Sequence, residues 1–421
     1  MEHKSVRIIK IHLGLFPSMK LIIHIDQKSI KVFFNNLGHF NYLLPSTFDT
    51  KERNWLDLPD HILNCISDLL IDINDYIRFG AVCRPWRYIY IENLRRHTTH
   101  RQLPLLMIPS EPCDLQNQTR SLYSLSENRV IPNFQIRLPH NKFCRGSSEG
   151  WLVVLDDNCT DVYLFNPFLS VDNKLELPHL TEFPHEEDEI FEGFLTKAVL
   201  SANPTSSFTN YVVMAIYGQY ARLAFFKPGD KTWTPLDFEY MVIEDVIYFN
   251  DQFFAVNFEG TVFAFDVNHH HLKQAELAPP PGNNIDTRKF LVNSLGNLLL
   301  VRRLMKRSEG EYCTTGFEVF KLDEFTRNWV QVESLGDQTL FLGDNTSISI
   351  SSSHYYGCKR NCIYFTDDYF EGYWVDKLSG PSDIGVFNLE DGSIKQHYPL
   401  KSNIVFPPPI WIEPTLQRCF N

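Results

Sequence analysis

The sequence has no apolar run of the length that crosses a membrane, no excess of basic residues and no regular cysteine pattern. A spanning helix needs about 20 apolar residues in a row, and the nearest stretch, residues 8–25, is interrupted by lysine, histidine and proline. Binding through nucleic-acid phosphates requires a basic surface, whereas the formal net charge is −12. We therefore expect neither a membrane nor a nucleic acid as a partner.

The nine cysteines are odd in number and irregularly spaced, and we see no secretory signal before them. Disulfide-bonded proteins occur in oxidising compartments, and their sequences usually have an even number of regularly spaced cysteines. We therefore expect reduced thiols and a cytoplasmic or nuclear location, or both. The N-terminal apolar stretch also allows interpretation as a transit peptide, but an extension without a packed structure is the preferred interpretation.

Motifs for catalysis, phosphate binding and metal binding are missing or incomplete. The sequence has no Gly-x-Ser-x-Gly, and "KPGDK" (227–231) lacks the spacing of a P-loop and lies between expected strands. His354, Cys358 and Cys362 supply three ligands where structural zinc needs four. Residues 269–271 (three histidines) and Asp367-Asp368 are interpreted as a loop and a turn. We expect no cofactor, no metal and no catalytic residue.

Aromatic residues, proline and glycine are abundant instead. Aromatics make up 14% of the chain, and 24 prolines and 20 glycines are spread along it. Aromatic residues favour strands, and proline and glycine favour the turns between them. A chain of 421 residues exceeds one ordinary domain, so we expect two domains, one of them a large β domain.

Helical periodicity is confined to a region near residues 57–94. In "DLPDHILNCISDLL", Ile62, Leu63, Ile66, Leu69 and Leu70 recur with helical spacing, after Asp57 near the N-cap and Pro59 near the first turn. A second helix should begin after Asp72 and stop at Arg84, because a residue before proline avoids the helical region.

Pro85 can then begin a third helix with Trp86 as its first large apolar residue. Three helices in about 45 residues are close to the lower size limit of a domain. Their apolar faces therefore predict either a helical cap on the β domain or a docking surface for another protein's helices.

From about residue 103 the sequence repeats one plan: apolar strands followed by a phenylalanine, a polar residue and a turn. The plan recurs five times, with spacings of 39–67 residues between the repeated phenylalanines, which are Phe165, Phe226, Phe265, Phe320 and Phe387. Repeated meanders of this period favour a β-propeller. A β-sandwich is the alternative, but it would not explain a five-fold recurrence.

We expect five or six blades, with the five phenylalanines buried at equivalent positions. The sixth blade would combine both ends of this region, using "LPLLMI" or "SLYSLS" and the segment near "NIVFPPP". Pairing between the ends removes open sheet edges. The predicted fold class is therefore α+β multidomain, with a short three-helix region followed by an all-β propeller.

With both regions located, the sequence resembles a plant F-box protein with a C-terminal KIB-type β-propeller domain. "LPDHILNCIS" and "RFGAVCRPWR" resemble the F-box, and "RGSSEGWLVVLD", "LFNPF", "FKPGDKTWT" and "GVFNLEDGS" resemble the propeller. The resemblance runs from residue 54 to about residue 409. It implies an extension of uncertain structure at 1–53, an F-box at 54–100 and a KIB-type propeller at 101–421.

The resemblance also implies a function. F-box helices dock onto a Skp-type adaptor, and through it onto a cullin scaffold, in an SCF ubiquitin ligase, while the propeller holds an unknown protein substrate. The expected adaptor-binding residues, or their immediate support, are Leu58, Pro59, Ile62, Leu63, Ile66, Val82, Cys83 and Trp86. Trp86 is either the interface anchor or a core residue of the helical region.

Two other functions stay open at this point. The propeller could serve as a protein-interaction module outside a ubiquitin ligase, which co-purification with a Skp-type adaptor would test. It could also be an enzyme of unknown class, which a cluster of buried, hydrogen-bonded titratable groups at the propeller mouth would favour.

Overall fold

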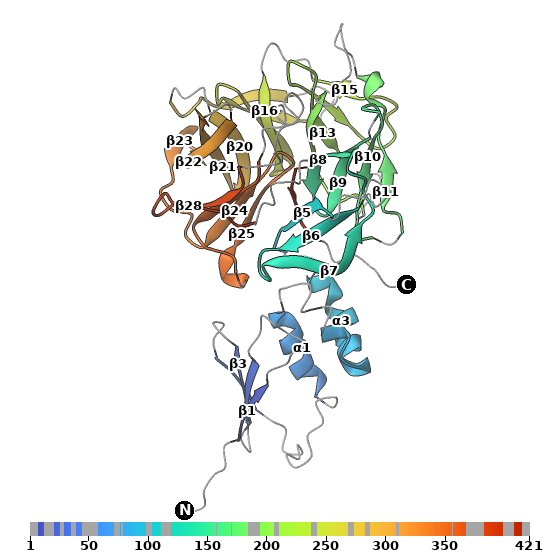
Figure 1. Ribbon diagram of the computed structural model, residues 1–421, viewed down its shortest axis with the longest axis vertical. Helices are drawn as coiled ribbons and strands as arrows, with labels where there is room; N and C mark the ends of the chain where they lie inside the picture. The colour runs from blue at the N-terminus through green and yellow to red at the C-terminus, as the bar shows by residue number, and fades with distance from the viewer. Residues whose placement is uncertain are drawn as a thin grey trace, which may run out of the picture. The chain divides into compact units, whose positions relative to one another are not determined.

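In the computed structural model the chain divides into two compact units, Met1–Gln102 and Leu103–Asn421 (Figure 1). The structure describes the following residues: 7–11, 21–25, 29–34, 39–43, 58–70, 76, 79–97, 103–110, 119–156, 158–169, 171–183, 194–205, 210–236, 242–267, 273–282, 287–308, 311–355, 357–367, 383–398 and 408–414.

The first unit contains a small antiparallel sheet, in a region where the sequence favoured an extension without a packed structure. Its strands pair in chain order, and they are β1 (Arg7–Ile11), β2 (Leu21–Ile25), β3 (Ser29–Phe34) and β4 (His39–Leu43). The apolar residues of this region are clumped, so no period of two identified the strands. Pairing between neighbouring segments, such as Arg7 opposite Ile25, determines them instead.

Helices α1 (Asp60–Leu69) and α3 (Arg84–His97) follow in the same unit. Pro59 is the N-cap of α1, and its carbonyl oxygen accepts hydrogen bonds from the amides of Ile62 and Leu63. Tyr76, Phe79 and Gly80 are also helical. Asp57 and Asp72 lie outside the described residues.

One predicted helix boundary was wrong. The second helix does not extend to Arg84, because a turn over residues 81–82 separates it from α3, which begins at Arg84. Pro85 therefore occupies the first turn of α3, where its missing N–H leaves no hydrogen bond unmade.

The second unit is a β-propeller of six blades arranged around one axis (Figure 1). We name the blades A to F in chain order. Blade A contains β5 (Leu105–Pro109), β6 (Arg120–Ser124), β7 (Arg129–Ile136) and, from the other end of the unit, β29 (Ile410–Ile412). Blade B contains β8 (Phe143–Ser148), β9 (Trp151–Leu155), β10 (Val162–Phe165) and β11 (Lys174–Glu176).

Blades C, D and E are four-stranded meanders in chain order. Blade C contains β12 (Leu195–Leu200), β13 (Val213–Tyr217), β14 (Arg222–Phe226) and β15 (Thr234–Pro235), after the short helix η2 (Leu180–Glu182). Blade D contains β16 (Ile243–Phe249), β17 (Gln252–Asn257), β18 (Val262–Asp266) and β19 (Lys273–Ala278). Blade E contains β20 (Thr287–Ser294), β21 (Asn297–Ser308), β22 (Glu311–Asp323) and β23 (Asn328–Gln331).

Blade F has five strands in the order β25-β24-β26-β27-β28. Their bounds are β24 (Gln338–Leu342), β25 (Ser347–Ser351), β26 (Cys362–Phe365), β27 (Gly385–Asn388) and β28 (Ile394–Lys395). The pair β24 and β26 is parallel, and a parallel pair needs a crossover. The chain makes that crossover through β25 and the short helix η3 (Ser352–His354).

The innermost strands adjoin one another around the axis. β12 lies beside β8, β16 beside β12, β20 beside β16 and β25 beside β20. An ideal Cβ atom on Gly146 of β8 would lie 2.1 Å from the carbonyl oxygen of Ala198 on β12. Only glycine permits this close approach of two strands from neighbouring blades.

Pairing between the two ends of the unit closes the propeller. Ile410, Trp411 and Ile412 of β29 pair with Met107, Leu106 and Leu105 of β5. Of the five or six blades expected, six are present, and the sixth combines both ends of the region as predicted; its C-terminal strand comes directly after "NIVFPPP". Closure leaves no open edge between the first and the last blade.

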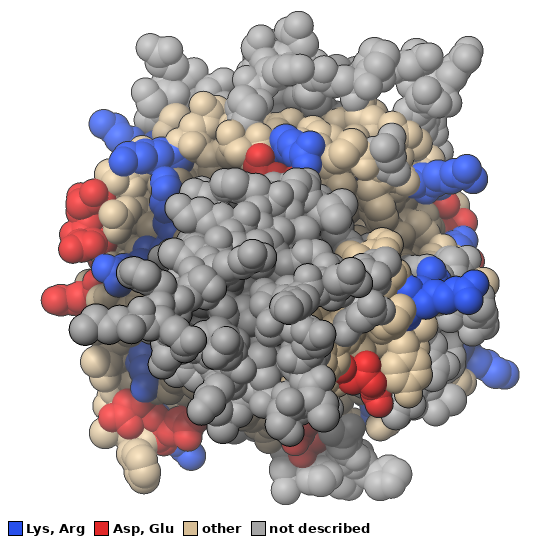
Figure 2. All heavy atoms as spheres, turned by 90° about the horizontal axis from the view of Figure 1, so that it is seen from below, with Lys and Arg blue, Asp and Glu red and all other residues tan. Residues whose placement is uncertain are grey.

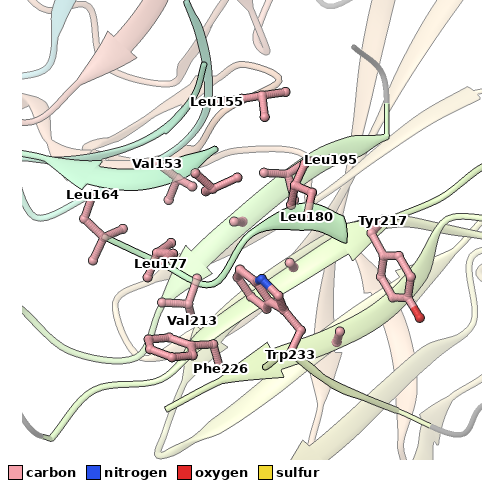
Figure 3. Close-up of a cluster of buried hydrophobic side chains, with 14 of the residues drawn as sticks. Val153, Leu155, Leu164, Leu177, Leu180, Leu195, Val213, Tyr217, Phe226 and Trp233 are labelled. Carbon is pink, nitrogen blue, oxygen red and sulfur yellow. The ribbon is translucent and has the colours of Figure 1, made fainter. Parts of the chain in front are cut away.

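The hydrophobic core consists of layers between consecutive blades. Strand residues alternate between two faces, so Trp151, Val153 and Leu155 of β9 face blade C, whereas Leu152 and Val154 face blade A. Figure 3 shows part of the layer between blades B and C, where Val153 and Leu164 lie near Leu195, Val213 and Phe226. This packing explains why β9 is apolar at every position.

The five repeated phenylalanines lie on the last strand but one of blades B to F. Each contributes to the layer shared with the preceding blade. Phe226, Phe265, Phe320 and Phe387 are buried, and Phe165 is half-buried. The recurrence in the sequence therefore corresponds to one position of the blade.

Candidate functional site

The helical region contains the residues expected at an adaptor interface, and the structure divides them into two groups. Ile62, Leu63, Ile66 and Trp86 are buried, with at most 6% of each residue exposed. Leu58, Pro59, Val82 and Cys83 are half-buried, at the start of α1 and in the turn before α3. The second group therefore retains surface that another protein can reach.

Trp86 belongs to an aromatic cluster inside this unit. Its ring centroid lies 4.8 Å from that of Phe79, and Tyr76 lies 4.7 Å from Tyr90. The Tyr76 hydroxyl donates a hydrogen bond to the carbonyl oxygen of Tyr90 at 2.6 Å. Burial raises the pKa of Tyr76, which keeps the hydroxyl protonated as a donor. Of the two roles considered for Trp86, its contacts are those of a core residue.

A polar contact holds the two helices together. The side-chain amide of Asn93 on α3 donates to Oδ1 of Asn64 at 2.6 Å and to the hydroxyl of Ser67 at 3.2 Å, both on α1. Asn93 and Ser67 are buried. Buried polar groups need such partners, so this contact specifies how α1 and α3 align.

Two exposed apolar residues of α3 were not among the predicted site residues. Tyr88 is 64% exposed and Ile91 is 55% exposed. Residues three apart share one face of a helix, so they form an apolar pair on the side opposite Ile89 and Tyr90, which are buried. A helical plot of residues 86–94 would have identified the pair.

In the propeller, seven charged residues form what we call the axial cluster. They lie on the innermost strands or in the turn before β25, and they are Arg145, Lys197, Glu244, Asp245, Arg288, Lys289 and Asp344. The side chains of Arg145, Lys197, Asp245 and Lys289 are 4% exposed or less, whereas Glu244, Arg288 and Asp344 are 16–25% exposed.

Ion pairs and hydrogen bonds connect the axial cluster across blades. Lys197 Nζ lies 2.5 Å from Asp245 Oδ1, and the other carboxylate oxygen of Asp245 accepts from the amide of Leu291 at 2.7 Å. Glu244 Oε2 accepts from the Lys289 amide at 3.0 Å and lies 3.5 Å from its Nζ. The cluster therefore links blades C, D and E.

Asp344 is approached by two guanidinium groups from different blades. Arg288 on β20 donates to its Oδ1 at 3.0 Å, and Nη1 of Arg145 on β8 lies 3.8 Å from its Oδ2. The second distance is an ion-pair distance that is too long for a hydrogen bond. Blades B, E and F thus meet at one carboxylate.

β-Bulges place several of these side chains. The register between the first and second strands shifts between Cys144 and Gly146, between Leu195 and Lys197, and between Ile243 and Asp245. A bulge redirects the side chains beside it. The same irregularity in blades B, C and D therefore positions Arg145, Lys197 and Glu244 near the axis.

Burial changes the acidity of one pair in the cluster. It raises the pKa of Glu244 and lowers the pKa of Lys289, and each group's charge partly reverses the shift of the other. The axial cluster is made of lysine, arginine and carboxylates, and it contains neither cysteine nor histidine. Its members are oppositely charged partners. A buried, hydrogen-bonded cluster of titratable groups is also the feature that would favour the enzyme alternative.

A second buried network was not predicted. Arg303, which is 1% exposed, donates to the hydroxyl of Thr314, to the carbonyl oxygen of Thr366 and to the carboxylate of Asp383. The amide of Asp383 in turn donates to Asp367 at 3.2 Å. The other members of this network are 11–80 positions away from Arg303 in the sequence, so no local sequence pattern predicted the network.

The incomplete metal-binding and phosphate-binding motifs of the sequence lie at a strand end, in a short helix and in the connections between strands of the propeller, where the structure describes them. Cys362 is buried at the start of β26, Cys358 is half-buried before it, and His354 ends η3. Among the described residues, no group of three or more histidine, cysteine or acidic residues has metal-binding geometry. Lys227–Lys231 form the turn between β14 and β15. Residues 269–271 and Asp368 lie outside the described residues.

Charge on the described residues of the face seen in Figure 2 is mixed. Figure 2 shows basic and acidic side chains in small, separate groups around the edge of the visible face.

No helix in the described part of the chain combines the length and apolar character that a membrane crossing needs. The seven cysteines among the described residues are free thiols.

Comparison with known proteins identifies a family and several relatives. A family model described as "KIB1-4 beta-propeller" matches residues 122–388. The F-box protein SKIP23 of Arabidopsis thaliana is 26% identical over 402 residues, which cover 85% of this chain and 95% of the relative. A second Arabidopsis thaliana F-box protein is 24% identical, covering 76% of this chain and 97% of the relative. An F-box/kelch-repeat protein of the same plant is also 24% identical, covering 88% and 97%.

Proposed function

Because this chain belongs to the KIB1-4 β-propeller family and is similar to plant F-box proteins, we propose that it is the substrate-recognition subunit of an SCF-type ubiquitin ligase. The helical region docks a Skp-type adaptor, which connects to a cullin scaffold, and the propeller holds a protein target. One observation carries the proposal: relatives named F-box proteins align with this chain over 95–97% of their own length.

The role is non-catalytic. Holding the target near the ubiquitin-charged enzyme makes transfer effectively intramolecular, so the rate rises through effective concentration. Every carboxylate of the axial cluster is paired with a lysine or an arginine; structural ion-pair networks also have this pairing, so the cluster does not by itself argue for catalysis. The seven free thiols among the described residues support a location in a reducing compartment, the cytoplasm or the nucleus.

The eight predicted adaptor-binding residues have two roles in this proposal. Leu58, Pro59, Val82 and Cys83 contact the adaptor, because they retain accessible surface. Ile62, Leu63, Ile66 and Trp86 support that surface from inside. Neither a nucleic acid nor a membrane belongs among the proposed partners.

The test compares two charge substitutions in the full-length protein. Val82→Asp places a carboxylate in the turn before α3 and should abolish co-purification with a Skp-type adaptor while the far-ultraviolet circular dichroism stays unchanged, because an interface does not tolerate a buried unpaired charge. Ile62→Asp places the same charge at a position that is 2% exposed and should melt the helical region itself.

Phe325→Asp is the matched control. Phe325 is fully exposed in the hairpin turn between β22 and β23, so its substitution should leave adaptor binding intact. Failure of the wild-type protein to bind any Skp-type adaptor would contradict the ligase role and would favour a propeller interaction module that acts outside a ubiquitin ligase. Normal binding by a folded Val82→Asp protein would contradict the proposed docking face.

A further inference from the structure

Three buried side-chain oxygens near the axial cluster have no hydrogen-bond partner among the described residues. They are Ser147 Oγ on β8, Asn345 Oδ1 in the turn between β24 and β25, and Ser347 Oγ at the start of β25. Ser147 is 3% exposed and Asn345 is 1% exposed. Buried polar atoms in folded proteins are almost always paired, so three unpaired oxygens indicate a missing partner.

These oxygens belong to one place in the fold. The amide of Ser147 donates to the carbonyl oxygen of Asn345 at 3.2 Å, and Ser347 is two residues further along the chain. The side-chain nitrogen of Asn345 donates to the carbonyl oxygen of Trp411 at 2.7 Å. That bond specifies the orientation of the amide, so Oδ1 is an acceptor in need of a donor.

Two arginines contact the residue next to Asn345. Arg145 is two residues before Ser147, Asp344 immediately precedes Asn345, and Arg288 on β20 bonds to Asp344. Both guanidinium groups lie at ion-pair distance from the Asp344 carboxylate. The place therefore combines hydroxyl groups and an amide oxygen with a pair of arginines, which bind carboxylates and phosphates well.

We propose that Arg145, Ser147, Arg288, Asn345 and Ser347 form a binding site for a small ligand that carries both an oxyanion and hydroxyl groups. The arginines and the serine hydroxyls bind the oxyanion, and a ligand hydroxyl donates to Asn345 Oδ1. The class includes phosphorylated polyols and hydroxycarboxylates. The site is separate from the helical region and does not depend on the adaptor role.

The test uses thermal unfolding and titration calorimetry of the full-length protein with four probes. Sulfate supplies an oxyanion without hydroxyl donors, glycerol supplies hydroxyls without charge, and glycerol 3-phosphate and citrate supply both. At equal ionic strength, glycerol 3-phosphate, citrate or both should raise the melting temperature saturably, because a ligand that binds only the folded state stabilises it. Sulfate and glycerol at the same concentration should give a smaller shift. A response to glycerol 3-phosphate would identify the oxyanion of the ligand as a phosphate, and a response to citrate would identify it as a carboxylate.

Two serines on the same strand make a matched pair of variants. Ser347→Ala removes a hydroxyl without a partner in the described chain, so the melting temperature should hold while the affinity for the responding probe falls about tenfold, the loss expected for one hydrogen bond to a charged group. Ser349 already bonds to Ser294 at 2.8 Å and to Gln338 at 3.2 Å. Ser349→Ala should therefore lower the melting temperature and keep the probe response.

Two results would overturn the proposal. One is the absence of a saturable response to both glycerol 3-phosphate and citrate, which would mean that only ordered water fills the place. The other is an equal response in wild-type and Ser347→Ala protein, which would place the probe elsewhere.

Discussion

The indole nitrogen of Trp411 donates a hydrogen bond to the carbonyl oxygen of Leu342 across 3.0 Å, and the carbonyl oxygen of Trp411 accepts one from Asn345. Leu342 belongs to blade F, and Trp411 belongs to the strand that completes blade A. The indole also packs edge-on against Phe341, with ring centroids 5.1 Å apart. A single side chain thus joins the last blade to the first.

Replacement of Trp411 should destabilise the closed propeller. Trp411→Ala should cost about 3–5 kcal/mol, as is usual for a buried aromatic residue, and Trp411→Phe should cost less because it removes the indole N–H but keeps a ring. Urea unfolding monitored by far-ultraviolet circular dichroism measures the loss of stability in both variants, because this signal reports the backbone and not the tryptophan that is replaced. Ile394→Ala, at a position that is 39% exposed, is the control. Equal midpoints for Trp411→Ala and Ile394→Ala would show that this contact does not hold the ring closed.

The buried pair Lys197 and Asp245 supports an asymmetric prediction. Asp245 also accepts hydrogen bonds from the amides of Leu291 and Val246, so Lys197→Met leaves the carboxylate two partners. Asp245→Leu removes the acceptor of the buried Lys197 ammonium group and of both amides, and breaking a buried pair in this way typically costs about 3–5 kcal/mol. Chemical denaturation should therefore rank Asp245→Leu as the less stable variant, and the reverse order would contradict the network described for blades C to E.

His397 should make stability depend on pH. Burial lowers its pKa to about 4 from the ordinary 6.5; its Nε2 lies 3.2 Å from the carbonyl oxygen of Phe365, and its ring lies between those of Tyr364 and Trp411. Between pH 6.5 and 4 the unfolded chain binds the proton more readily, so stability falls as pH falls through this window. The total loss is about 3 kcal/mol.

His397→Gln isolates this contribution, because an amide can still donate to Phe365 but does not titrate. Urea midpoints measured from pH 7 to pH 4 should fall less steeply in the variant than in the wild-type protein. Parallel curves for the two proteins would assign the acid sensitivity to other groups.

The repeated phenylalanines allow a comparison within one set. Phe265 is 1% exposed and Phe165 is half-buried, although both occupy the same blade position. Phe265→Ala should cost about 3–5 kcal/mol and lower the melting temperature clearly, whereas Phe165→Ala should cost less. Differential scanning fluorimetry decides the order. Similar losses of stability at both positions would mean that burial of the ring does not determine how much each repeated phenylalanine stabilises its blade.

Local patterns determined much of the fold. The apolar run in "GWLVVLD" predicts a strand buried on both faces, and β9 packs blade A with one set of side chains and blade C with the other. Asn250 and Asp251 predict a tight turn, and both adopt positive φ angles, 46° and 60°, between β16 and β17. Such features depend on residues within a few positions of one another, so the sequence alone contains them.

Contacts between distant segments were decided only by the tertiary structure. The sheet over residues 7–43, the extra strand of blade F and the convergence of Arg145 and Arg288 on Asp344 each depend on where separate segments meet. The apolar face of α1 predicted a docking surface, but the fold buries Ile62, Leu63 and Ile66. An apolar stripe shows that a helix must pack against something, and only the assembled chain shows whether that partner is already present.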